Sequence, residues 1–357
     1  MPLSDYDFHL PQEHIAQVPA DRREESRLLV LDRSAPDLAL DRFHHIGRYL
    51  RSGDLLVLND TRVFPARLRG RRPTGGRVEV FLLSPLPEDP LRWRALVRPA
   101  KAGRGPGAVR IDGAAQVEVE AVAEEDGGLF QVQVRRAGEA LDPSGVFAVC
   151  EEAGEVPLPP YIRREPGDPR QALDRERYQT VYAIHPGAAA APTAGLHFTR
   201  ELLEELESQG IGSVAVTLAV GLGTFQPLRE ETLQAGRLHR EAVSIGAAAA
   251  GRVLEARAAG GRIVAVGTTS ARALESWALA GSPVPQSAWK ADTDLLIGPG
   301  YRFRLVDALV TNFHLPRSSL LLLVSALAGR ERILDAYRRA IAEGLRFYSY
   351  GDAMLIL

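Results

Sequence analysis

Residues 185–227 read HPGAAAAPTAGLHFTRELLEELESQGIGSVAVTLAVGLGTFQP, and they set the fold class that we expect for the chain. A loop rich in proline, glycine and alanine leads to Thr199, a good N-cap residue, with Glu201 in the first turn of a helix. Gly210 ends this helix, whose apolar stripe consists of leucines. Residues 214–220 follow as a strand with valine or leucine at every second position. The stretch therefore predicts a helix–strand unit with a loop at each end.

The two loops of this unit are candidates for a ligand site, because rigid elements hold loops at their ends in place. His197 lies in the first loop, and Gly221 and Gly223 lie in the second, where glycine lets a backbone approach a ligand closely. The alternative is a tight connection whose glycines serve only turns. A single loop does not exclude that alternative, but two loops on one unit favour a site.

The composition is that of an ordinary globular protein. With 357 residues and a formal net charge of −2, the chain has room for one large domain or two ordinary ones. No overall basic field favours nucleic acid, although a local basic face is enough to bind phosphates. Lys101 and Lys290 are the only lysines, so the positive charge is almost entirely arginine, which suits bidentate phosphate contacts. A composition bias of the genome explains most of this preference.

Several classes of protein are disfavoured. Cys150 is the only cysteine, which excludes an intrachain disulfide and a cysteine metal cluster. The start, MPLSDYDFHLP, lacks the basic and apolar regions of a signal peptide. The longest apolar run, around residues 320–327, is far shorter than the roughly 20 residues of a membrane-spanning helix. We therefore expect a cytosolic protein.

A buried strand followed by polar residues is predicted at residues 54–72, DLLVLNDTRVFPARLRGRR. The apolar run 55–58 suits a strand buried on both faces. Asn59, Asp60 and Arg62 come directly after it, where a buried strand usually passes into a functional loop. The alternative for the first two is an Asx-turn. The arginines that follow form either a solvated basic edge or a phosphate contact.

The hydrophobic pattern of the sequence changes between residues 73 and 149. Three segments alternate with period 2, at residues 78–82, 117–121 and 130–134, and turns separate them. We interpret residues 73–149 as an inserted all-β module, a small barrel. Trp93, Arg98 and Lys101 place an aromatic ring near two cations there, which suits RNA as well as an ordinary barrel rim.

Beyond the module, helices and strands alternate to the C-terminus, as in α/β proteins. Arg177 and Tyr178 belong to the polar face of the segment ALDRERYQTVYA. Residues 262–267 predict a strand, and Thr268, Thr269 and Ser270 then cap a helix. A strand, a hydroxyl-bearing turn and a helix form a natural anion site, since free N–H groups point at the turn. A plain N-cap is the equal alternative.

Familiar cofactor motifs are absent. In GLGTFQ, Gln226 stands where the dinucleotide fingerprint requires its third glycine. The sequence contains no Walker A loop, no HExxH zinc motif and no G-x-S-x-G nucleophile elbow. The histidines show no metal spacing beyond the weak pair His239 and Glu241. The chain therefore favours acid–base or electrostatic chemistry on an organic substrate, with no bound metal or prosthetic group.

Eight strings together are specific for one family. In chain order they are GDLLVLNDTRVFPARL, EVPLPPYI, RERYQTVYA, APTAGLHFT, VTLAVGLGTFQP, VAVGTTSARALE, VDALVTNFHLP and YSYGDAML. In this combination and order the chain resembles the S-adenosylmethionine:tRNA ribosyltransferase-isomerases of queuosine biosynthesis. Almost the whole chain takes part, while residues 73–149 match loosely.

The resemblance implies a fold and a reaction. The fold is a barrel-like α/β main domain, residues 1–72 and 150–357, with a small β-barrel domain inserted at residues 73–149. S-Adenosylmethionine serves as a ribosyl donor, and the acceptor is the aminomethyl-7-deazaguanine (preQ1) base at the wobble position of tRNA. The product is epoxyqueuosine, and adenine and methionine are released. We also expect the protein to act as a monomer.

The chemistry requires proton transfer. A sulfonium acidifies the adjacent C5′–H, and departing adenine needs a proton or strong hydrogen bonds. His197, His239 and Glu241 have suitable pKa values, if burial shifts the last one. We hypothesise that His197 or Glu241 is the base and that His239 is the proton donor.

The substrates are assigned to two sets of residues. For S-adenosylmethionine we expect Thr193, Gly195, Gly221, Gly223, Thr224, Thr268, Thr269 and Ser270. For tRNA we expect Asn59, Asp60, Arg62, Arg98, Arg177, Tyr178 and Phe198. The last two are aromatic partners for an unstacked wobble base, although each is also a natural core residue.

Two other classes of function stay open on the residues alone. A small-molecule enzyme that uses S-adenosylmethionine or a nucleotide without RNA fits the modest net charge. A non-catalytic RNA-binding module fits the inserted barrel but leaves the polar loops of the α/β part unexplained.

Overall fold

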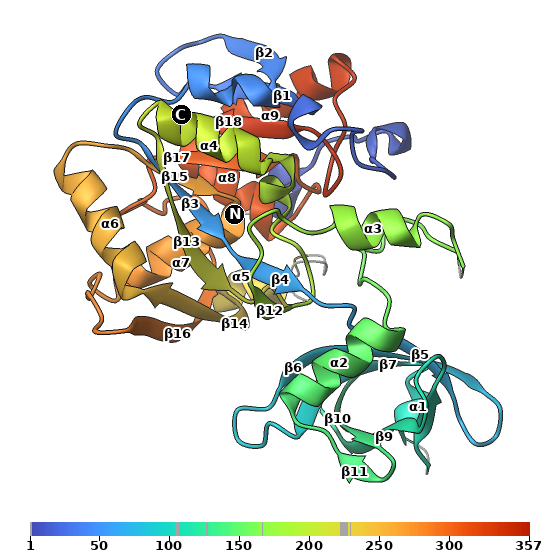
Figure 1. The fold of residues 1–357 in the computed structure, drawn as a ribbon. Coiled ribbons are helices and arrows are strands. Elements are labelled where there is room, and N and C mark those ends of the chain that lie inside the picture. The colour runs from blue at the N-terminus through green and yellow to red at the C-terminus, as the bar shows by residue number, and fades with distance from the viewer. Residues whose placement is uncertain (1, 105–106, 126–127, 166, 222–227, 229) are drawn as a thin grey trace.

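The computed structural model has two lobes joined by a few connecting segments (Figure 1). It describes residues 2–104, 107–125, 128–165, 167–221, 228 and 230–357. The larger lobe contains both chain ends and a mixed α/β fold. The smaller lobe is the all-β insertion. Among the described residues, no helix is both long and apolar enough to cross a membrane.

A nine-stranded mixed sheet forms the centre of the larger lobe. In spatial order its strands are β16 (Ala288–Leu295), β14 (Arg237–Gly246), β13 (Gly212–Leu218), β3 (Leu55–Asn59), β15 (Ile263–Val266), β17 (Ala308–Asn312), β18 (Ala353–Ile356), β1 (Arg27–Leu31) and β2 (Leu38–Arg42). The neighbours β13, β3, β15 and β17 run parallel. Strands β16 and β2 are the two edges, so the described sheet is open. This corrects the barrel-like main domain that the resemblance implied.

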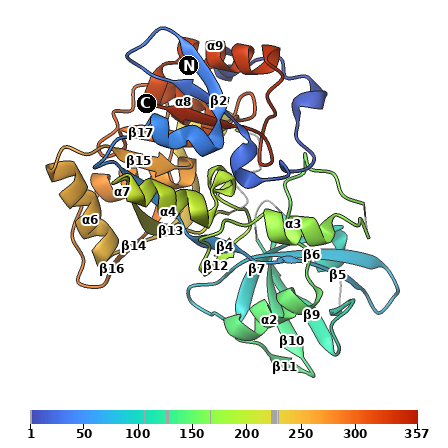
Figure 2. The same cartoon turned by 45° about the horizontal axis from the view of Figure 1, so that its top comes forward.

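Helices cover both faces of this sheet (Figures 1 and 2). On one face lie the 3₁₀ segment η4 (Phe43–Arg48) and α4 (Arg200–Ser208), which pack on Leu56 and Leu58 of β3. The other face meets α6 (Ala247–Ala258), α7 (Thr268–Leu279), α8 (Ser319–Ala328) and α9 (Arg330–Ala342). Leu55 and Val57 point to that second face. Burial on both faces explains why β3 is a continuous apolar run.

The smaller lobe is a closed antiparallel barrel. Its strands are β5 (Arg67–Arg71), β6 (Arg77–Pro85), β7 (Arg92–Arg98), β8 (Val109–Ile111), β9 (Val117–Glu124) and β10 (Leu129–Arg136), with β11 (Glu139–Ala140) appended to β10. Pairing of β9 with β10 closes the ring. Every second residue of the predicted alternating segments points into its core, together with Trp93. Trp93 therefore belongs to the core and not to a surface cluster with Arg98.

The insertion is longer than residues 73–149. Strand β5 lies inside the barrel sheet, and α2 (Pro143–Ala153) packs against it. The chain enters and leaves through a backbone pair: Arg67 N–H donates to Glu155 O over 3.2 Å, and Glu155 N–H donates to Arg67 O over 2.9 Å. The short helix α1 (Lys101–Arg104) contacts β7 and β9.

Short elements connect the lobes and form the remaining surface. Strand β4 (Thr61–Val63) leads out to the barrel and pairs in parallel with β12 (His185–Ala188), which lies on the returning segment after α3 (Gln171–Arg177). The remaining elements are η1 (Leu3–Tyr6), η2 (Gln12–His14) and η3 (Arg23–Glu25) in the N-terminal arm, η6 (Thr193–His197) before α4, and α5 (Glu230–Ala235) before β14. The predicted capping of α4 is confirmed, since Leu202 N–H donates to Thr199 Oγ1 over 3.1 Å.

Candidate functional site

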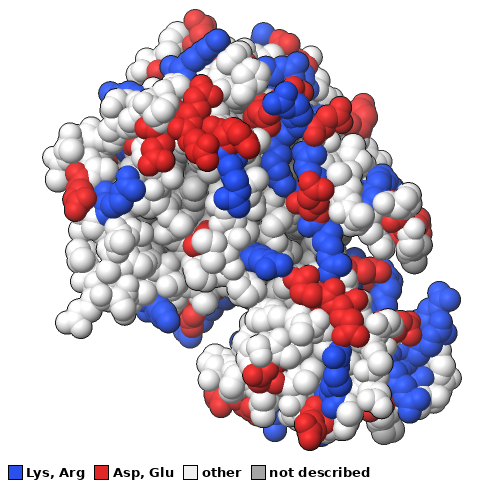
Figure 3. Space-filling view, viewed as in Figure 1, with Lys and Arg blue, Asp and Glu red and all other residues white. Residues whose placement is uncertain are grey.

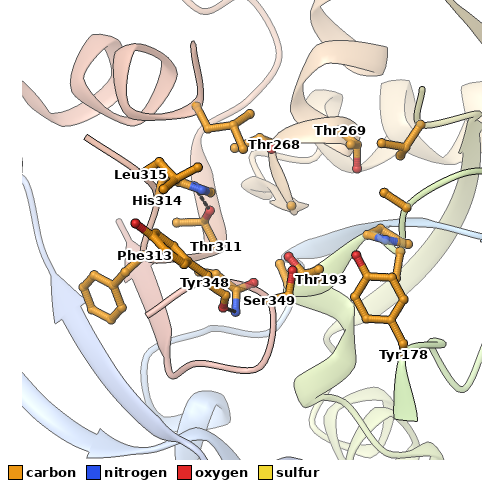
Figure 4. A pocket seen from close by; sticks show the side chains of 18 of the residues that line it. Tyr178, Thr193, Thr268, Thr269, Thr311, Phe313, His314, Leu315, Tyr348 and Ser349 are labelled. Atoms are coloured by element: carbon orange, nitrogen blue, oxygen red, sulfur yellow. Dashed lines mark hydrogen bonds between the residues drawn. The ribbon is translucent and has the colours of Figure 1, made fainter. Parts of the chain in front are cut away.

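A small cavity lies where the carboxyl ends of parallel strands meet, the usual place for a ligand in an open α/β sheet. Its volume is about 70 Å³. Figure 4 shows side chains from several loops facing one centre. The lining residues are Tyr161, Tyr178, Ala190, Ala191, Pro192, Thr193, Ala194, Val220, Gly267, Thr268, Thr269, Thr311, Asn312, Phe313, His314, Leu315, Leu320, Tyr348 and Ser349. This volume is smaller than the roughly 300 Å³ of ordinary small-molecule pockets.

The N-terminus of α7 opens onto this cavity. Gly267 is its N-cap residue with φ 91°, a left-handed conformation that favours glycine, and no side chain caps the helix. The first N–H groups of α7 are therefore available to an anion. Thr268 and Thr269, which we assigned to the donor from the sequence, line the cavity, but neither is the cap. Ser270 Oγ donates to the carbonyl oxygen of Val266, the last residue of β15, so its proton is not available to a ligand.

Two buried polar atoms on the cavity wall have no hydrogen-bond partner among the described residues. They are the hydroxyl of Tyr178 and Oδ1 of Asn312. Tyr178 is 1% exposed, and burial raises the pKa of its phenol. Its ring therefore lines this cavity and is too buried to present a face to RNA. Buried polar groups are almost always paired, so these two atoms are places where a polar ligand or a water can bond.

His314 is the histidine of this cavity. It follows β17, and its Nε2 lies 2.7 Å from Thr311 Oγ1, as the dashed line in Figure 4 marks. Burial lowers its pKa to about 3, so the ring is neutral near pH 7. A neutral imidazole at this position can exchange a hydrogen bond or a proton with a ligand.

His197 occupies a different place from the one expected of a catalytic base. Its Nδ1 lies 2.7 Å from Ser26 Oγ, and its Nε2 lies 3.1 Å from Asn312 Nδ2. The ring also packs on Phe43 at 5.1 Å between centroids. Both nitrogens are thus occupied by protein groups. His197 does not line the cavity, but it contacts Asn312, which does.

Glu241 is held in a buried ion pair. One carboxylate oxygen accepts from Arg272 Nη1, and the other accepts from Gly221 N–H over 2.8 Å. Both partners of the ion pair are about 7% exposed at their side chains. The carboxylate thus anchors the residue after Val220, a cavity residue, and is not free to act as a base. His239 is exposed on β14, away from the cavity.

The remaining residues assigned to the donor divide into two groups. Thr193 of η6 lines the cavity. Gly195 does not, and its lack of a side chain has a packing reason, because a Cβ there would lie 1.9 Å from the hydroxyl of Tyr182. Gly223 and Thr224 lie outside the residues that the structure describes.

Asn59 and Asp60 are internal. The amide of Asn59 donates to Leu218 O and to Thr269 Oγ1, and its oxygen accepts from Leu218 N–H at 3.0 Å. Thr217 Oγ1 donates to Asp60 over 2.7 Å, and burial raises the pKa of that carboxyl. Both residues tie β3 to β13 and are too buried to contact RNA. Asn59 instead positions Thr269 at the cavity.

Three further residues assigned to RNA have protein partners. Arg62 is exposed and pairs with Glu151 of α2 at 3.1 Å. Arg177 donates to the carbonyl oxygens of Ala20 and Asp21 and so fixes the N-terminal arm. Phe198 is 0% exposed in the core beneath α4, where it presents no face to a base.

Arg98 faces a second and larger space. A cleft of about 760 Å³ lies between the barrel and the segment that returns from it, including α3. Arg98 of β7 and Arg163 line it, and neither has an ion-pair partner among the described residues. Figure 3 shows Arg and acidic side chains alternating over the junction of the lobes. Tyr161 lines the cavity and Ile162 lines the cleft, so the two spaces adjoin across this short segment.

The described residues offer no candidate metal centre. No group of three or more His, Cys, Asp and Glu side chains is arranged to hold an ion there. Cys150 is buried in the barrel, and burial raises the pKa of its thiol to about 12.

The assignments drawn from the sequence missed Asn312, His314 and Arg163. The first two follow a buried strand in the string TNFHLP, and polar residues at that position were the available signal. Arg163 carried no signal, since it is one arginine among many.

Comparison with known proteins points to one family. A sequence profile described as queuosine biosynthesis protein matches residues 3–356. An S-adenosylmethionine:tRNA ribosyltransferase-isomerase from Pelobacter propionicus is 49% identical over 357 residues, which are 100% of each chain. One from Anaeromyxobacter dehalogenans is 50% identical, over 100% of this chain and 99% of its own. The crystal structure of S-adenosylmethionine tRNA ribosyltransferase from Thermotoga maritima superimposes with a TM-score of 0.54 at 33% identity, over 99% of this chain and 100% of that one.

Proposed function

The chain belongs to the family of queuosine biosynthesis proteins and is an S-adenosylmethionine:tRNA ribosyltransferase-isomerase, and we propose the reaction in detail. It transfers and isomerises the ribosyl group of S-adenosylmethionine onto the preQ1 base at the tRNA wobble position. Epoxyqueuosine forms, and adenine and methionine leave. S-Adenosylmethionine is a co-substrate, and no prosthetic group takes part. The protein acts as a monomer in the cytosol.

The observation that carries this proposal is the cavity at the carboxyl ends of the parallel strands. It combines the open N-terminus of α7 with two unpaired polar atoms and a wall of tyrosines. The helix N-terminus suits the methionine carboxylate, because N–H groups and the helix dipole favour an anion. Thr193, Thr268 and Thr269 add hydroxyl groups for the donor. Aromatic rings suit the adenine.

The acceptor RNA belongs in the adjoining cleft. Unpaired Arg98 and Arg163 provide contacts to phosphates of the anticodon loop, and the cleft volume of about 760 Å³ has room for a base turned out of its stack. Tyr161 lines the cavity and its chain neighbour Ile162 lines the cleft, so a base held in the cleft would be near a donor held in the cavity.

Proton transfer falls to His314 in this arrangement. It is the histidine on the cavity wall, whereas His197 and Glu241 are occupied by protein partners. To accept the proton that the sulfonium acidifies at C5′ and return one to departing adenine, His314 would need its pKa to rise from about 3 toward neutrality in the occupied site.

One assay tests the function. Purified protein is incubated with S-adenosylmethionine and tRNA that carries preQ1, and free adenine and methionine are measured. Release that requires this tRNA supports the proposal. Release without RNA favours a small-molecule enzyme, and RNA binding without release favours a binding module.

The proposed RNA contact of Arg98 can be tested against a matched control, Arg94, on the same strand. Arg98→Ala should weaken tRNA binding and reduce the slope of log K against log salt by about 1, since one phosphate contact is lost. Arg94 lies on the same strand but is paired with Glu125 at 3.1 Å, so Arg94→Ala should leave the slope unchanged. Equal slopes for both variants would place the RNA elsewhere.

A further inference from the structure

Asn312 has one polar atom that its own protein does not use. It is the last residue of β17, is 2% exposed and lines the cavity. Its amide nitrogen makes two hydrogen bonds, whereas its Oδ1 makes none among the described residues. A buried acceptor without a partner destabilises a fold, so its presence indicates a donor that arrives with a ligand.

The direction of this amide is fixed by its neighbours. Asn312 Nδ2 lies 3.1 Å from Tyr348 O, and a carbonyl oxygen can only accept, so the amide cannot be turned over. The same nitrogen lies 3.1 Å from His197 Nε2, which must therefore also accept. Oδ1 is therefore the atom left without a partner among the described residues, on a residue that lines the cavity.

His197 takes part in a chain of hydrogen bonds with one possible direction. With Nε2 as acceptor, the proton of the neutral ring is on Nδ1, which donates to Ser26 Oγ over 2.7 Å. Ser26 Oγ in turn donates to Arg23 O over 3.3 Å. Burial lowers the pKa of His197 to about 4, which keeps the ring neutral. A protonated ring would present an N–H to Nδ2 and break the chain.

The residues around Asn312 Oδ1 indicate which chemical group of a ligand would bind there. Oδ1 requires an N–H or O–H donor. The cavity residues include no Asp or Glu to neutralise an ammonium, so a charged amine is disfavoured. Tyr161, Phe313 and Tyr348 line the same cavity and suit a planar ring. A neutral amino group on a flat heterocycle meets both conditions.

Resting on the proposed function, we propose that Asn312 Oδ1 accepts a hydrogen bond from the exocyclic amino group of the donor's adenine. Asn312 is then the residue that selects adenine over other purines. His197 and Ser26 are positioning residues, which fix the side of the amide nitrogen and leave the oxygen free to accept.

The test compares S-adenosylmethionine with its inosine analogue, in which a carbonyl oxygen replaces the amino group. Calorimetry on the full-length protein gives the ratio of the two dissociation constants. The wild type should prefer the adenine form by about tenfold to a hundredfold, since the analogue sets one carbonyl oxygen against another. Asn312→Ala should reduce this ratio to near one. Tyr178→Phe removes the other unpaired group and should leave the ratio unchanged.

His197 is tested by a rescue. His197→Leu should lower the ratio, while His197→Gln, whose amide oxygen can accept from Asn312 Nδ2, should keep most of it. A purely structural role would change thermal stability in both variants but not the ratio. If Asn312→Ala does not fold, Asn312→Ser provides the same comparison.

Three results would overturn the assignment. They are an unchanged ratio in the Asn312 variants, a wild-type ratio near one, and a loss of affinity in Asn312→Ala that disappears with a donor lacking the α-amino group. The last result would place the methionine ammonium at Oδ1. The ratio of dissociation constants is measured without RNA and tests only the role of Asn312. Failure of the tRNA-dependent assay would instead refute the proposed reaction, so the two outcomes can be distinguished.

Discussion

Replacing Glu241 by glutamine distinguishes a structural role of its carboxylate, as the counter-charge of Arg272, from a role as general base. The carboxylate neutralises Arg272, and both side chains are about 7% exposed. Glu241→Gln keeps an oxygen for Gly221 N–H but leaves a buried guanidinium without a counter-charge. Breaking a buried pair from one side costs about 3–5 kcal/mol.

This cost translates into a measurable shift in Tm. Unfolding entropy of about 2.1 cal/mol/K per residue gives about 0.75 kcal/mol/K for 357 residues. The expected fall in Tm is therefore about 4–7 °C, measured by calorimetry with the full-length protein. The double variant Glu241→Gln/Arg272→Met removes both charges and should recover at least half of the loss.

Enzyme activity tests the alternative, that Glu241 is a general base. A general base contributes about 10²–10⁴-fold to kcat, and the double variant could not restore such a loss. We expect instead that turnover, measured well below the transition, falls mainly through a higher KM for S-adenosylmethionine, because Gly221 adjoins the cavity residue Val220. An unchanged Tm together with a kcat loss of about a thousandfold would refute the structural role of Glu241.

Three further predictions concern the cavity and its supports. His314→Gln should lower kcat by about a hundredfold or more with a small change in KM, and a loss below tenfold in single-turnover assays would exclude it from proton transfer. Burial lowers the pKa of His197 to about 4 and of His314 to about 3, so below pH 6.5 the unfolded chain binds more protons. Stability should thus be complete above pH 6.5 and fall toward pH 4, by up to about 1.4 kcal/mol per pH unit for each histidine; a flat urea-denaturation profile there would contradict the burial of both rings. Gly195→Ala sets a Cβ 1.9 Å from the Tyr182 hydroxyl and should cost about 1–3 kcal/mol, part of which Tyr182→Phe restores; an undiminished Tm would show that the site relaxes freely.

The cavity is small for its proposed ligand. Its volume of about 70 Å³ lies below the roughly 300 Å³ of ordinary ligand pockets, so we expect its walls to move apart when the donor binds. Leu315 is 36% exposed and lies on the wall, which makes the loop after β17 the accessible side.

Local pattern determined the elements and the family. The leucines of α4, its Thr199 cap and the alternation along β13 follow from periods of 3.6 and 2, which the sequence displays directly. The period-2 segments of residues 78–134 likewise predicted the β insertion, and motifs spread over the chain carried the family. These features depend on neighbours in sequence, so the sequence was sufficient for them.

Contacts between distant residues determined the rest. Whether the main sheet closes depends on the edges β16 and β2, which no local pattern relates. Whether a polar residue is free depends on partners far along the chain: His197 is occupied by Ser26 and Asn312, and Glu241 by Arg272. The sequence around a histidine in a glycine-rich loop is the same whether its nitrogens are bonded by the protein or free for a ligand. Only the tertiary structure saturates its nitrogens and leaves Asn312 Oδ1 unpaired, because hydrogen bonding in a folded interior is decided by spatial neighbours.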